Sequence, residues 1–451
     1  MEPAALSALS PVDGRYRKSA DGLRAVLSES GLIRERVRIE AAWLLVLAEA
    51  VPSLPGAALT DPVRQRAGAL AREPGDDAPA AVKAIEARIN HDVKAVEYFV
   101  REQLAASGAS PAVLELVHFG CTSEDINNLA YARMLRTARQ LLVGDLGQVI
   151  EKLRAFAHEH AALPMLSRTH GQTASPTTLG KEFANVVVRL QRARTRLEKV
   201  EILGKWNGAV GNYNAHVAAL PTVDWPQVSR RFVESQGLAW NEYSTQIEPH
   251  DWIGEYCDAL AAINTILIDF ARDTWGYISL GYLRQRAVAG EVGSSTMPHK
   301  VNPIDFEIAL GIANALLHHF AAKLPISRWQ RDLTDSTVLR NVGVALAHSV
   351  IAWNALTRGL GKIAANPVKI AADIEQAFEV LGEALQTALR AAGVPNGYEL
   401  LKDFTRGTDV DAAGLAAFID KLPLPPAERA RLKSLAPQQY LGLAAEMAGR
   451  V

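Results

Sequence analysis

Residues 81–105 read AVKAIEARINHDVKAVEYFVREQLA, and the spacing of their apolar side chains decides the expected fold class. These side chains recur every three or four positions and therefore line one face of a helix: Val82, Ile85, Ile89, Val93, Val96 and Val100. The same spacing recurs at residues 32–50, 126–160, 179–203 and 253–280, whereas strand-like alternation is sparse. The sequence predicts an all-α protein.

Several of these segments are long and more apolar than a simple surface helix requires. They predict a long central helical bundle whose outer faces pack against other subunits, although one large monomeric bundle would also bury them. Proline-rich breaks at residues 51–62 and 72–79, and the pair Asn366-Pro367, mark the flanking parts. The expected division is an N-terminal helical domain at 1–112, a central bundle domain at 113–364 that carries most of the active site, and a C-terminal helical domain at 365–451.

Composition excludes several classes of protein. The chain has 451 residues, 49% of them hydrophobic, and a formal net charge of −1, so no global positive field attracts nucleic acid. Its two cysteines, Cys121 and Cys257, are far apart, which argues against a disulfide framework or a cysteine zinc site. The N-terminus lacks a signal-peptide pattern, and no apolar stretch is long enough to span a bilayer. We expect a cytoplasmic protein that binds no membrane.

The stretch at residues 289–303, AGEVGSSTMPHKVNP, interrupts the helical pattern with glycine, proline and hydroxyl residues. Such a composition predicts a loop. Its Ser294, Ser295, Lys300 and Asn302 could close over an anionic ligand, although a solvated turn would explain the same residues.

A second polar stretch, SRTHGQ at residues 167–172, carries His170. We expect this imidazole at the edge of a loop, where acid–base residues tend to lie, although a lone histidine is more often structural. The following Ser175-Pro176 predicts an N-cap with proline at the first position of the next helix.

Two further stretches combine capping residues with candidate ligand contacts. In NHDV at residues 90–93, Asn90 or Asp92 could cap a new helix, and contact with a ligand is the alternative. In HFGCTSEDINN at residues 118–128, Thr122 and Asp125 predict a capping box with aspartate in place of glutamate. The hydroxyls of Thr122 and Ser123, with helix N-terminal amides behind them, could seat an anion, although capping alone would explain both residues.

The stretch SRWQRDLTDSTVLR at residues 327–340 is rich in arginine. Arg328, Arg331 and Arg340, beside Ser336, could hold a carboxylate or phosphate through bidentate contacts. An exposed helix carrying salt bridges is the alternative interpretation.

Motifs of other mechanisms are absent from the sequence. We find no phosphate-binding Gly-x-x-x-x-Gly-Lys-Ser/Thr loop, no dinucleotide-binding Gly-x-Gly-x-x-Gly turn in a βαβ context, no His-Glu-x-x-His metal helix and no Gly-x-Ser-x-Gly elbow. Serine, histidine, lysine and arginine on a helical frame suit proton transfer on an anionic substrate. We expect neither a metal nor a redox cofactor.

These polar stretches carry a resemblance to a known family. Residues 293–303, GSSTMPHKVNP, resemble the signature loop of the fumarase/aspartase superfamily, whose members eliminate fumarate from succinyl compounds. Residues 10–16, 90–93, 121–128, 168–171 and 328–336 resemble, in the same order, the bacterial-type adenylosuccinate lyases. The resemblance covers nearly the whole chain and is weak only beyond about Pro367.

The resemblance implies a set of roles. Ser294 would be the general base and His170 the general acid, and His91 and His118 would help to form the site. The substrate-binding positions implied by the family or by the basic stretch are Arg15, Tyr16, Asn90, His91, Asp92, His118, Thr122, Ser123, Gln246, Ser295, Lys300, Val301, Asn302, Arg328, Arg331, Ser336 and Arg340.

The resemblance also implies the reaction and the assembly. The family cleaves adenylosuccinate to AMP and the succinylated ribotide SAICAR to AICAR in purine nucleotide biosynthesis, as a homotetramer with sites built from three chains. One departure is that, after Glu307, this chain reads Ile308-Ala-Leu-Gly-Ile where the family has Asn-Ser-Glu-Gly-Asn, about three residues longer. Another superfamily activity, such as that of argininosuccinate lyase or aspartase, and a helical scaffold without catalysis are the alternatives.

Overall fold

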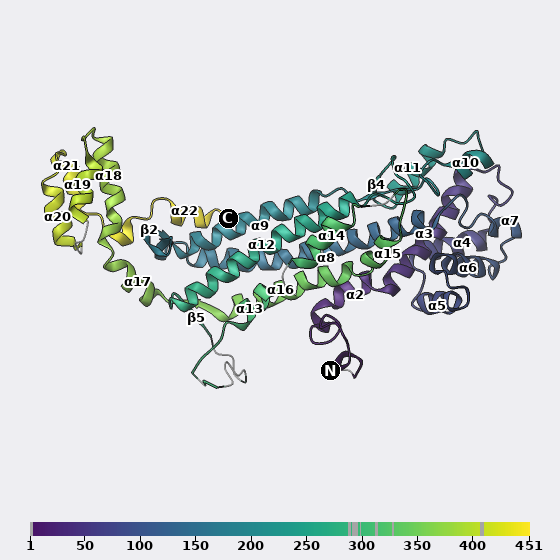
Figure 1. The fold of residues 1–451 in the computed structure, drawn as a ribbon, viewed down its shortest axis with the longest axis horizontal. Coiled ribbons are helices and arrows are strands. Elements are labelled where there is room, and N and C mark those ends of the chain that lie inside the picture. The colour runs from purple at the N-terminus through teal and green to yellow at the C-terminus, as the bar shows by residue number, and fades with distance from the viewer. Residues whose placement is uncertain are drawn as a thin grey trace. The chain divides into compact units, whose positions relative to one another are not determined.

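The computed structural model describes residues 3–286, 290, 296–297, 299–311, 314–326, 329–405 and 410–451. Helices predominate among them, as the apolar spacing predicts (Figure 1). Backbone packing separates two compact units. Unit 1 comprises Met1–Leu146, Ala193–Thr265 and Ile312–Asn354, and unit 2 comprises Gly147–Arg192, Ile266–Gly311 and Ala355–Val451. These boundaries fall at other positions than the three expected domains, whose division stays a prediction.

Unit 1 begins with a series of helices before its first long one. They are α1 (Pro3–Leu6), η1 (Arg17–Ala20), α2 (Asp21–Leu27), α3 (Glu29–Ala50), α4 (Asp61–Arg72), α5 (Ala78–Ile89), α6 (Asp92–Ala105) and α7 (Pro111–Leu114). Residues 81–105 thus form parts of two helices, which separate at Asn90, whose φ of 54° ends α5 in the left-handed conformation. The cap expected at Asn90 or Asp92 is wrong, because the intervening His91 caps α6: its Nδ1 accepts a hydrogen bond from the Lys94 amide at 3.2 Å.

Long helices confirm the periodic segments at residues 32–50, 126–160, 179–203 and 253–280. They are α3 and, further along the chain, α8 (Ser123–Glu159), α9 (Leu179–Lys199) and α12 (Asp251–Ser279). The long helix α16 (Val342–Lys362) lies outside the segments whose spacing predicts a helix. In unit 1, α12 and α16 are joined by buried polar contacts: Asn264 Nδ2 donates to Ser349 Oγ at 2.8 Å, and Trp353 Nε1 donates to Asn264 Oδ1 at 2.9 Å. In unit 2, the Phe183 ring of α9 lies 4.3 Å from Phe156 of α8 and 5.3 Å from Phe270 of α12, measured between ring centroids.

Three small two-stranded sheets interrupt the helices. The antiparallel pairs are β1 (Pro164–Thr169) with β2 (Gln172–Thr178) and β5 (Leu283–Gln285) with β6 (Ile363–Ala365), and the parallel pair is β3 (Leu203–Gly204) with β4 (Ala239–Trp240). The cap predicted at Ser175-Pro176 is wrong, because these residues lie in β2, where Pro176 is paired with Leu166. Helix α9 begins only at Leu179, and Thr178 Oγ1 accepts a hydrogen bond from the Lys181 amide at 3.1 Å.

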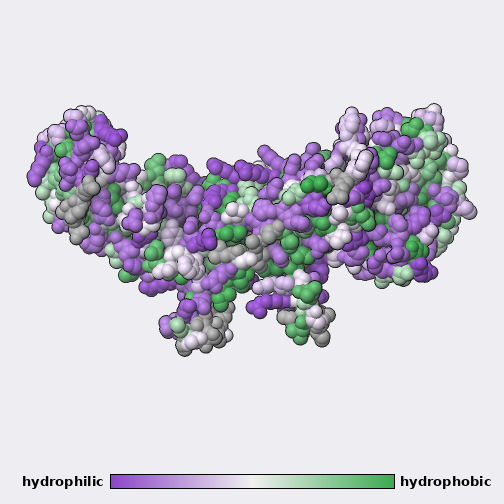
Figure 2. All heavy atoms as spheres, in the orientation of Figure 1, coloured by the Kyte–Doolittle hydropathy of each residue, from purple (hydrophilic) through white to green (hydrophobic). Residues whose placement is uncertain are grey.

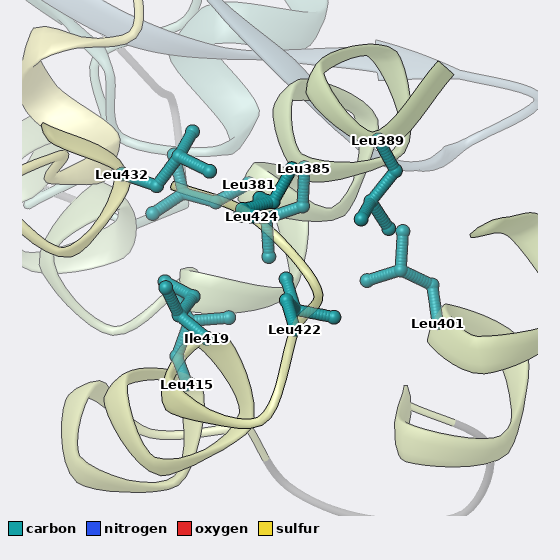
Figure 3. Packing of buried hydrophobic residues seen from close by; sticks show 9 residues of the cluster. All are labelled: Leu381, Leu385, Leu389, Leu401, Leu415, Ile419, Leu422, Leu424 and Leu432. Atoms are coloured by element: carbon teal, nitrogen blue, oxygen red, sulfur yellow. The ribbon is translucent and has the colours of Figure 1, made fainter. Parts of the chain in front are cut away.

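Unit 2 includes a cluster of short C-terminal helices with its own apolar core. The elements are α17 (Pro367–Glu375), η2 (Phe378–Leu381), α18 (Gly382–Ala391), α19 (Gly397–Thr405), α20 (Ala412–Asp420), α21 (Pro426–Lys433), η3 (Pro437–Gln439) and α22 (Ala444–Gly449). Figure 3 shows buried side chains of η2, α18, α19 and α20 converging, among them Leu385, Leu401 and Ile419. Burying such side chains contributes roughly 1.5–3 kcal/mol each, so this core stabilises a segment with few sequence motifs.

The remaining helices are α10 (Asn214–Ala219), α11 (Trp225–Ser235), α13 (Ile304–Gly311), α14 (Ala315–Lys323) and α15 (Thr334–Leu339). Of the segment shortened after Glu307, residues 308–311 lie in α13, and Ile312 lies outside the described residues.

The face drawn in Figure 2 shows mainly hydrophilic side chains with hydrophobic ones among them. In unit 1, three large apolar side chains near each other in sequence are well exposed: Ile326 at 63%, Trp329 at 92% and Leu333 at 71%. Within the described ranges, no helix combines the length and apolar character needed to cross a bilayer.

Candidate active site

The predicted site residues fall into three sets. The set in unit 1 comprises Arg15, Tyr16, Asn90, His91, Asp92, His118, Thr122, Ser123, Gln246, Arg331, Ser336 and Arg340. The set in unit 2 comprises His170, Lys300, Val301 and Asn302. Ser294, Ser295 and Arg328 lie outside the described residues.

Asp92 lies between two guanidinium groups at the start of α6. Its Oδ2 is 2.9 Å from Arg36 Nη2 and 2.9 Å from Arg340 Nη2. Burial alone would raise the pKa of Asp92, but the charge of Arg36, the Val93 amide and the charge of Arg340 outweigh it and hold the pKa below its usual value. The ionised carboxylate therefore joins an arginine of α3 to one that follows α15.

Arg36 is a residue that sequence reasoning missed. Its side chain is only 2% exposed, and its Nε donates to Asn127 Oδ1 at 2.9 Å. The available signal was a charged residue between the apolar residues Ile33 and Val37 in a predicted helix. Because a buried charge requires partners, an arginine at such a position indicates a carboxylate nearby.

A second residue that sequence reasoning missed is Glu124, which joins Arg36 and Asn127 to Arg331. Glu124 Oε1 accepts a hydrogen bond from Asn127 Nδ2 at 2.7 Å and lies 2.7 Å from Arg331 Nη1. Arg331 Nη2 also lies 3.7 Å from Asp335 Oδ1. Burial and the charge of Glu124 raise the pKa of Asp335 against the opposing effect of Arg331. Arg331 is thus held by buried carboxylates and does not belong to a solvated helix.

Arg340 is the most accessible cation of the group. Its Nη1 donates to Ser336 Oγ at 2.8 Å, one helical turn earlier, and its Nε lies 3.6 Å from Glu29 Oε2. The side chain is 35% exposed, so an anion in solution can reach it. Such an anion would compete with Asp92 and Glu29 for the guanidinium group.

Thr122 and Ser123 stand at the start of α8. The Thr122 amide donates to Asp125 Oδ2 at 2.8 Å. This confirms one hydrogen bond of the predicted capping box, the one from the N-cap amide to the side chain three residues later. Asp125 is buried, and its Oδ1 also accepts from the amides of Asn207 at 3.0 Å and Gly208 at 3.3 Å, and lies 3.0 Å from Lys205 Nζ. The position of Thr122 therefore depends on a buried ion pair, while the anion seat stays a prediction.

His118 lies just before this helix and is paired with a buried carboxylate. Its Nδ1 is 2.6 Å from Glu40 Oε1 of α3. The backbone of His118 is left-handed, with φ of 63°, and the neighbouring Phe119 carbonyl accepts a hydrogen bond from Trp43 Nε1 at 3.0 Å. Helix α3 thus holds both the ring and the backbone of this segment.

The other predicted residues of unit 1 contribute fewer contacts. The Arg15 guanidinium carbon lies 5.8 Å from the centroid of the Tyr16 ring, within range of a cation–π contact. Gln246 is half-buried, directly before the buried Ile247, while Asn90 and His91 are exposed. These positions are open to a ligand, and their binding roles stay predictions.

His170 occupies the tip of the β1–β2 hairpin in unit 2. Thr169 pairs with Gln172, so His170 and Gly171 form a two-residue turn, and both have positive φ values of 55° and 74°. The imidazole is exposed at the tip, which agrees with the expected loop position. Near the tip, Arg168 Nη2 donates to the Tyr282 hydroxyl at 3.3 Å and lies 3.8 Å from Asp373 Oδ2, which anchors the hairpin.

Lys300, Val301 and Asn302 follow a partly described stretch of unit 2. The Lys300 amide donates to the Met297 carbonyl at 3.0 Å, and the Val301 carbonyl accepts from Gln285 Nε2 at 2.7 Å. Lys300 and Val301 are exposed, and Asn302 is half-buried. The Gln285 contact ties the end of the predicted loop to strand β5.

The arrangement in unit 1 suits recognition of a substrate with several negative charges. Arg36 and Arg340 are ion-paired with Asp92, and Arg331 is ion-paired with the buried Glu124. In the part of the chain that the structure describes, no group of three or more histidine, cysteine, aspartate or glutamate side chains is placed to hold a metal ion.

Replacing Arg340 with glutamine is expected to raise the KM for an anionic substrate roughly 10- to 100-fold. A hydrogen bond to a charged group contributes about 1.5–3 kcal/mol, and Asp92 keeps Arg36 as its partner in the variant. Steady-state kinetics of Arg340→Gln would measure the change. Arg230→Gln, which removes an exposed cation paired with Glu234, is the matched control and should leave KM unchanged. An unchanged KM in Arg340→Gln would contradict the assigned binding role.

Comparison with known families identifies the class of protein. A sequence model of a lyase family matches residues 14–317, and a model of the adenylosuccinate lyase C-terminal region matches residues 327–441. The fold, the site and these matches define a lyase of the fumarase/aspartase superfamily.

The curated relatives narrow this class. The chain is 51% identical over 453 residues to adenylosuccinate lyase of Escherichia coli strain K12, covering 99% of each chain. It is 50% identical over 456 residues to the adenylosuccinate lyase of Vibrio cholerae, covering 100% of each, and 49% identical over 451 residues to that of Haemophilus influenzae, covering 99% of each. The chain belongs to the adenylosuccinate lyase family.

Solved structures agree on the fold. The chain superposes on 3-carboxy-cis,cis-muconate lactonizing enzyme from Pseudomonas putida with a TM-score of 0.72 at 24% identity, covering 95% of this chain and 96% of the other. It superposes on fumarate lyase from Mesorhizobium sp. BNC1 with a TM-score of 0.74 at 20% identity and the same coverage. At these identities the likeness concerns the fold, and it confirms the all-α, fumarase-like architecture.

Proposed function

We propose that this chain eliminates fumarate from adenylosuccinate to release AMP, and from SAICAR to release AICAR, in purine nucleotide biosynthesis. The observation that carries the proposal is about 50% identity to adenylosuccinate lyases over the full length of both chains. The model of the adenylosuccinate lyase C-terminal region, which matches residues 327–441, supports it beside the general lyase model.

The chemistry requires removal of a weakly acidic proton and departure of a nitrogen. In the proposed mechanism Ser294, ionised to its alkoxide, takes the proton from the carbon beside a succinyl carboxylate and becomes a neutral hydroxyl. The electrons of that C–H bond form the double bond of fumarate as the C–N bond breaks. His170 donates a proton to the departing nitrogen, which leaves as a neutral amine. Lys300 and the arginines stabilise the negative charge that develops on the substrate.

The exposure of His170 supports its proposed role. A general acid must reach the substrate directly or through one water molecule, and an exposed turn between two paired strands allows this. The hairpin is at the same time anchored by Arg168, so the imidazole stands on a supported element.

The proposed substrate carries a phosphate and two carboxylates, whereas the net charge of the protein is −1. Local cations must therefore supply the attraction. The proposed contacts are the arginines of unit 1 with Ser336 and the helix-start hydroxyls Thr122 and Ser123. The ion pairs of Asp92 with Arg36 and Arg340 keep these two guanidinium groups placed before the substrate arrives.

The proposal includes a homotetramer in the cytoplasm, with each active site shared between chains. The exposed Ile326, Trp329 and Leu333 support burial of this part of unit 1 against another subunit. The free thiols Cys121 and Cys257 fit a reducing compartment. Light scattering of the purified protein should return four times the mass of one chain, and a monomer would contradict the assembly.

Fumarate release from both substrates is the direct test. The purified, sized oligomer is expected to convert adenylosuccinate and SAICAR with the ultraviolet absorbance change of each reaction, and fumarate should appear in equal amount to AMP or AICAR. Argininosuccinate and aspartate are the control substrates and should release none.

Two results would contradict the proposal in different ways. Fumarate from argininosuccinate or aspartate alone would assign another activity of the superfamily. Binding of AMP and fumarate without turnover of either succinylated substrate would indicate a helical scaffold that has lost catalysis.

A further inference from the structure

Helix α3 carries an unusual pair of buried charges, and the second of them has no assigned role. Arg36 and Glu40 lie four residues apart, so they share one face of the helix. Arg36 reaches Asp92, as described above, while Glu40 is 0% exposed and reaches His118. The same helix face thus contacts two of the predicted substrate-site residues.

Within the described part of the chain, Glu40 depends on His118 for its charge pairing. Its Oε1 lies 2.6 Å from His118 Nδ1, and its Oε2 is buried without a hydrogen-bond partner among the described residues. An isolated buried carboxylate is costly, so the proton on Nδ1 is strongly favoured. When the imidazole is neutral and its proton is on Nδ1, Nε2 is a hydrogen-bond acceptor. In the imidazolium Nε2 carries a proton too and becomes a second donor.

The orientation of the ring follows from its exposure. The His118 side chain is 20% exposed and its partner is completely buried. Because Nδ1 faces the buried Glu40, we infer that the exposed part of the ring includes the Nε2 edge. The backbone on the C-terminal side is closely packed as well, because a Cβ on Gly120 would lie 2.4 Å from His216 Nε2.

We propose that Glu40 is a positioning residue of the substrate site: its carboxylate accepts the Nδ1 proton of His118, presents the Nε2 edge outward and keeps the ring positively charged toward an anionic group of the substrate. The inference rests on the proposed function for the identity of that substrate. The pairing itself is independent of it.

The surrounding charges agree with a protonated ring. Carboxylates from three packed elements face His118: Glu40 on α3, Glu97 on α6 and Asp125 on α8. Glu97 is neutralised by Lys94, at 2.8 Å, and Asp125 by Lys205, at 3.0 Å. Burial alone would lower the pKa of His118, but the charge and hydrogen bond of Glu40, with smaller effects of Glu97 and Asp125, raise the pKa above its usual value.

Glu40→Gln is the test, because it keeps the shape of the side chain and removes its charge. The midpoint of the His118 titration, followed by NMR of ring-labelled histidine and assigned through the signal missing in His118→Gln, should fall below that of the wild type. Glu97→Gln is the matched control, since it removes a buried carboxylate that acts on His118 only through space, and its shift should be smaller.

A kinetic readout distinguishes positioning from a merely structural role. Between the two His118 midpoints that NMR measures, the KM of Glu40→Gln should be about tenfold above that of the wild type, the effect of weakening one charge-assisted hydrogen bond, with a smaller change in kcat. The ratio of the two KM values should shrink below the lower midpoint, because the imidazole of the variant is then protonated as well. A loss of stability alone would leave this ratio independent of pH.

The outcomes separate the inference from the proposed function. An unchanged His118 titration in Glu40→Gln, or a KM ratio that is the same between the two midpoints as below both, would overturn the positioning role. Should the variant not fold, the wild type still decides, because neutral His118 carrying its proton on Nε2 would refute the pairing. If the wild type converts neither substrate, the proposed function fails, while the titration continues to test the effect of Glu40 on His118.

Discussion

Replacing His170 with asparagine is expected to lower kcat by about 10²- to 10⁴-fold, the usual contribution of a general acid, while the hairpin keeps its conformation. The choice of asparagine matters because His170 has a φ of 55° at the turn, and asparagine tolerates the left-handed region better than most residues. Alanine would combine loss of the imidazole with backbone strain. Steady-state and single-turnover rates with adenylosuccinate would measure the effect.

The control for this substitution is His158→Asn, which makes the same change at an exposed histidine whose Nε2 lies 2.9 Å from the Val451 carbonyl. Its rate should stay within about threefold of the wild type, as expected for a surface position. Ser294→Ala provides the companion test of the proposed base and should show a loss of similar size. Near-normal turnover in His170→Asn, with an unchanged circular dichroism spectrum, would refute the assignment of the acid.

Replacing Asp125 with asparagine is expected to destabilise unit 1 by about 3–5 kcal/mol, because it leaves Lys205 buried without its counter-charge. The side chains of Asp125 and Lys205 are 1% and 0% exposed, so water cannot compensate the loss. The same carboxylate accepts hydrogen bonds from the backbone amides of Thr122, Asn207 and Gly208. The neutral side-chain oxygen of asparagine would accept these hydrogen bonds less strongly. Calorimetric unfolding should show a midpoint several degrees lower.

A double-mutant cycle sharpens this result. Lys205→Met alone leaves Asp125 as the unpaired buried charge and should also destabilise the protein, whereas Asp125→Asn with Lys205→Met removes both charges. The double variant should be more stable than the sum of the single effects predicts, since the energetic cost comes mainly from a charge without its partner. Strict additivity would mean that the two groups do not interact.

Local patterns were sufficient to predict the helices. The spacing that predicts helices at residues 32–50, 126–160, 179–203 and 253–280 depends on neighbours three and four positions apart, and the observed helices end within a few residues of these bounds. The errors arose where a distant partner intervened. Ser175-Pro176 has the local form of a helix start, but pairing of this stretch with β1 makes it a strand.

For the candidate site, too, the sequence predicted part of what the structure shows. The chain's polar stretches and their family resemblance predicted Asp92, His118, Arg331 and Arg340, and the structure places these residues among charged or polar partners. The binding and catalytic roles stay predictions, and Ser294 lies outside the described residues.

The sequence by itself determined the helical class, the family and the residue types available for proton transfer, because each depends on local spacing or on a contiguous motif. Only the tertiary structure decided which buried partners hold those residues. Glu40 contacts His118, which lies 78 residues further along the chain. Glu124 is likewise ion-paired with Arg331, which belongs to a distant part of the sequence. A carboxylate at a helical position carries no local sign of its distant partner, and burial in the folded chain, where unpaired charge is costly, is what selects the pair.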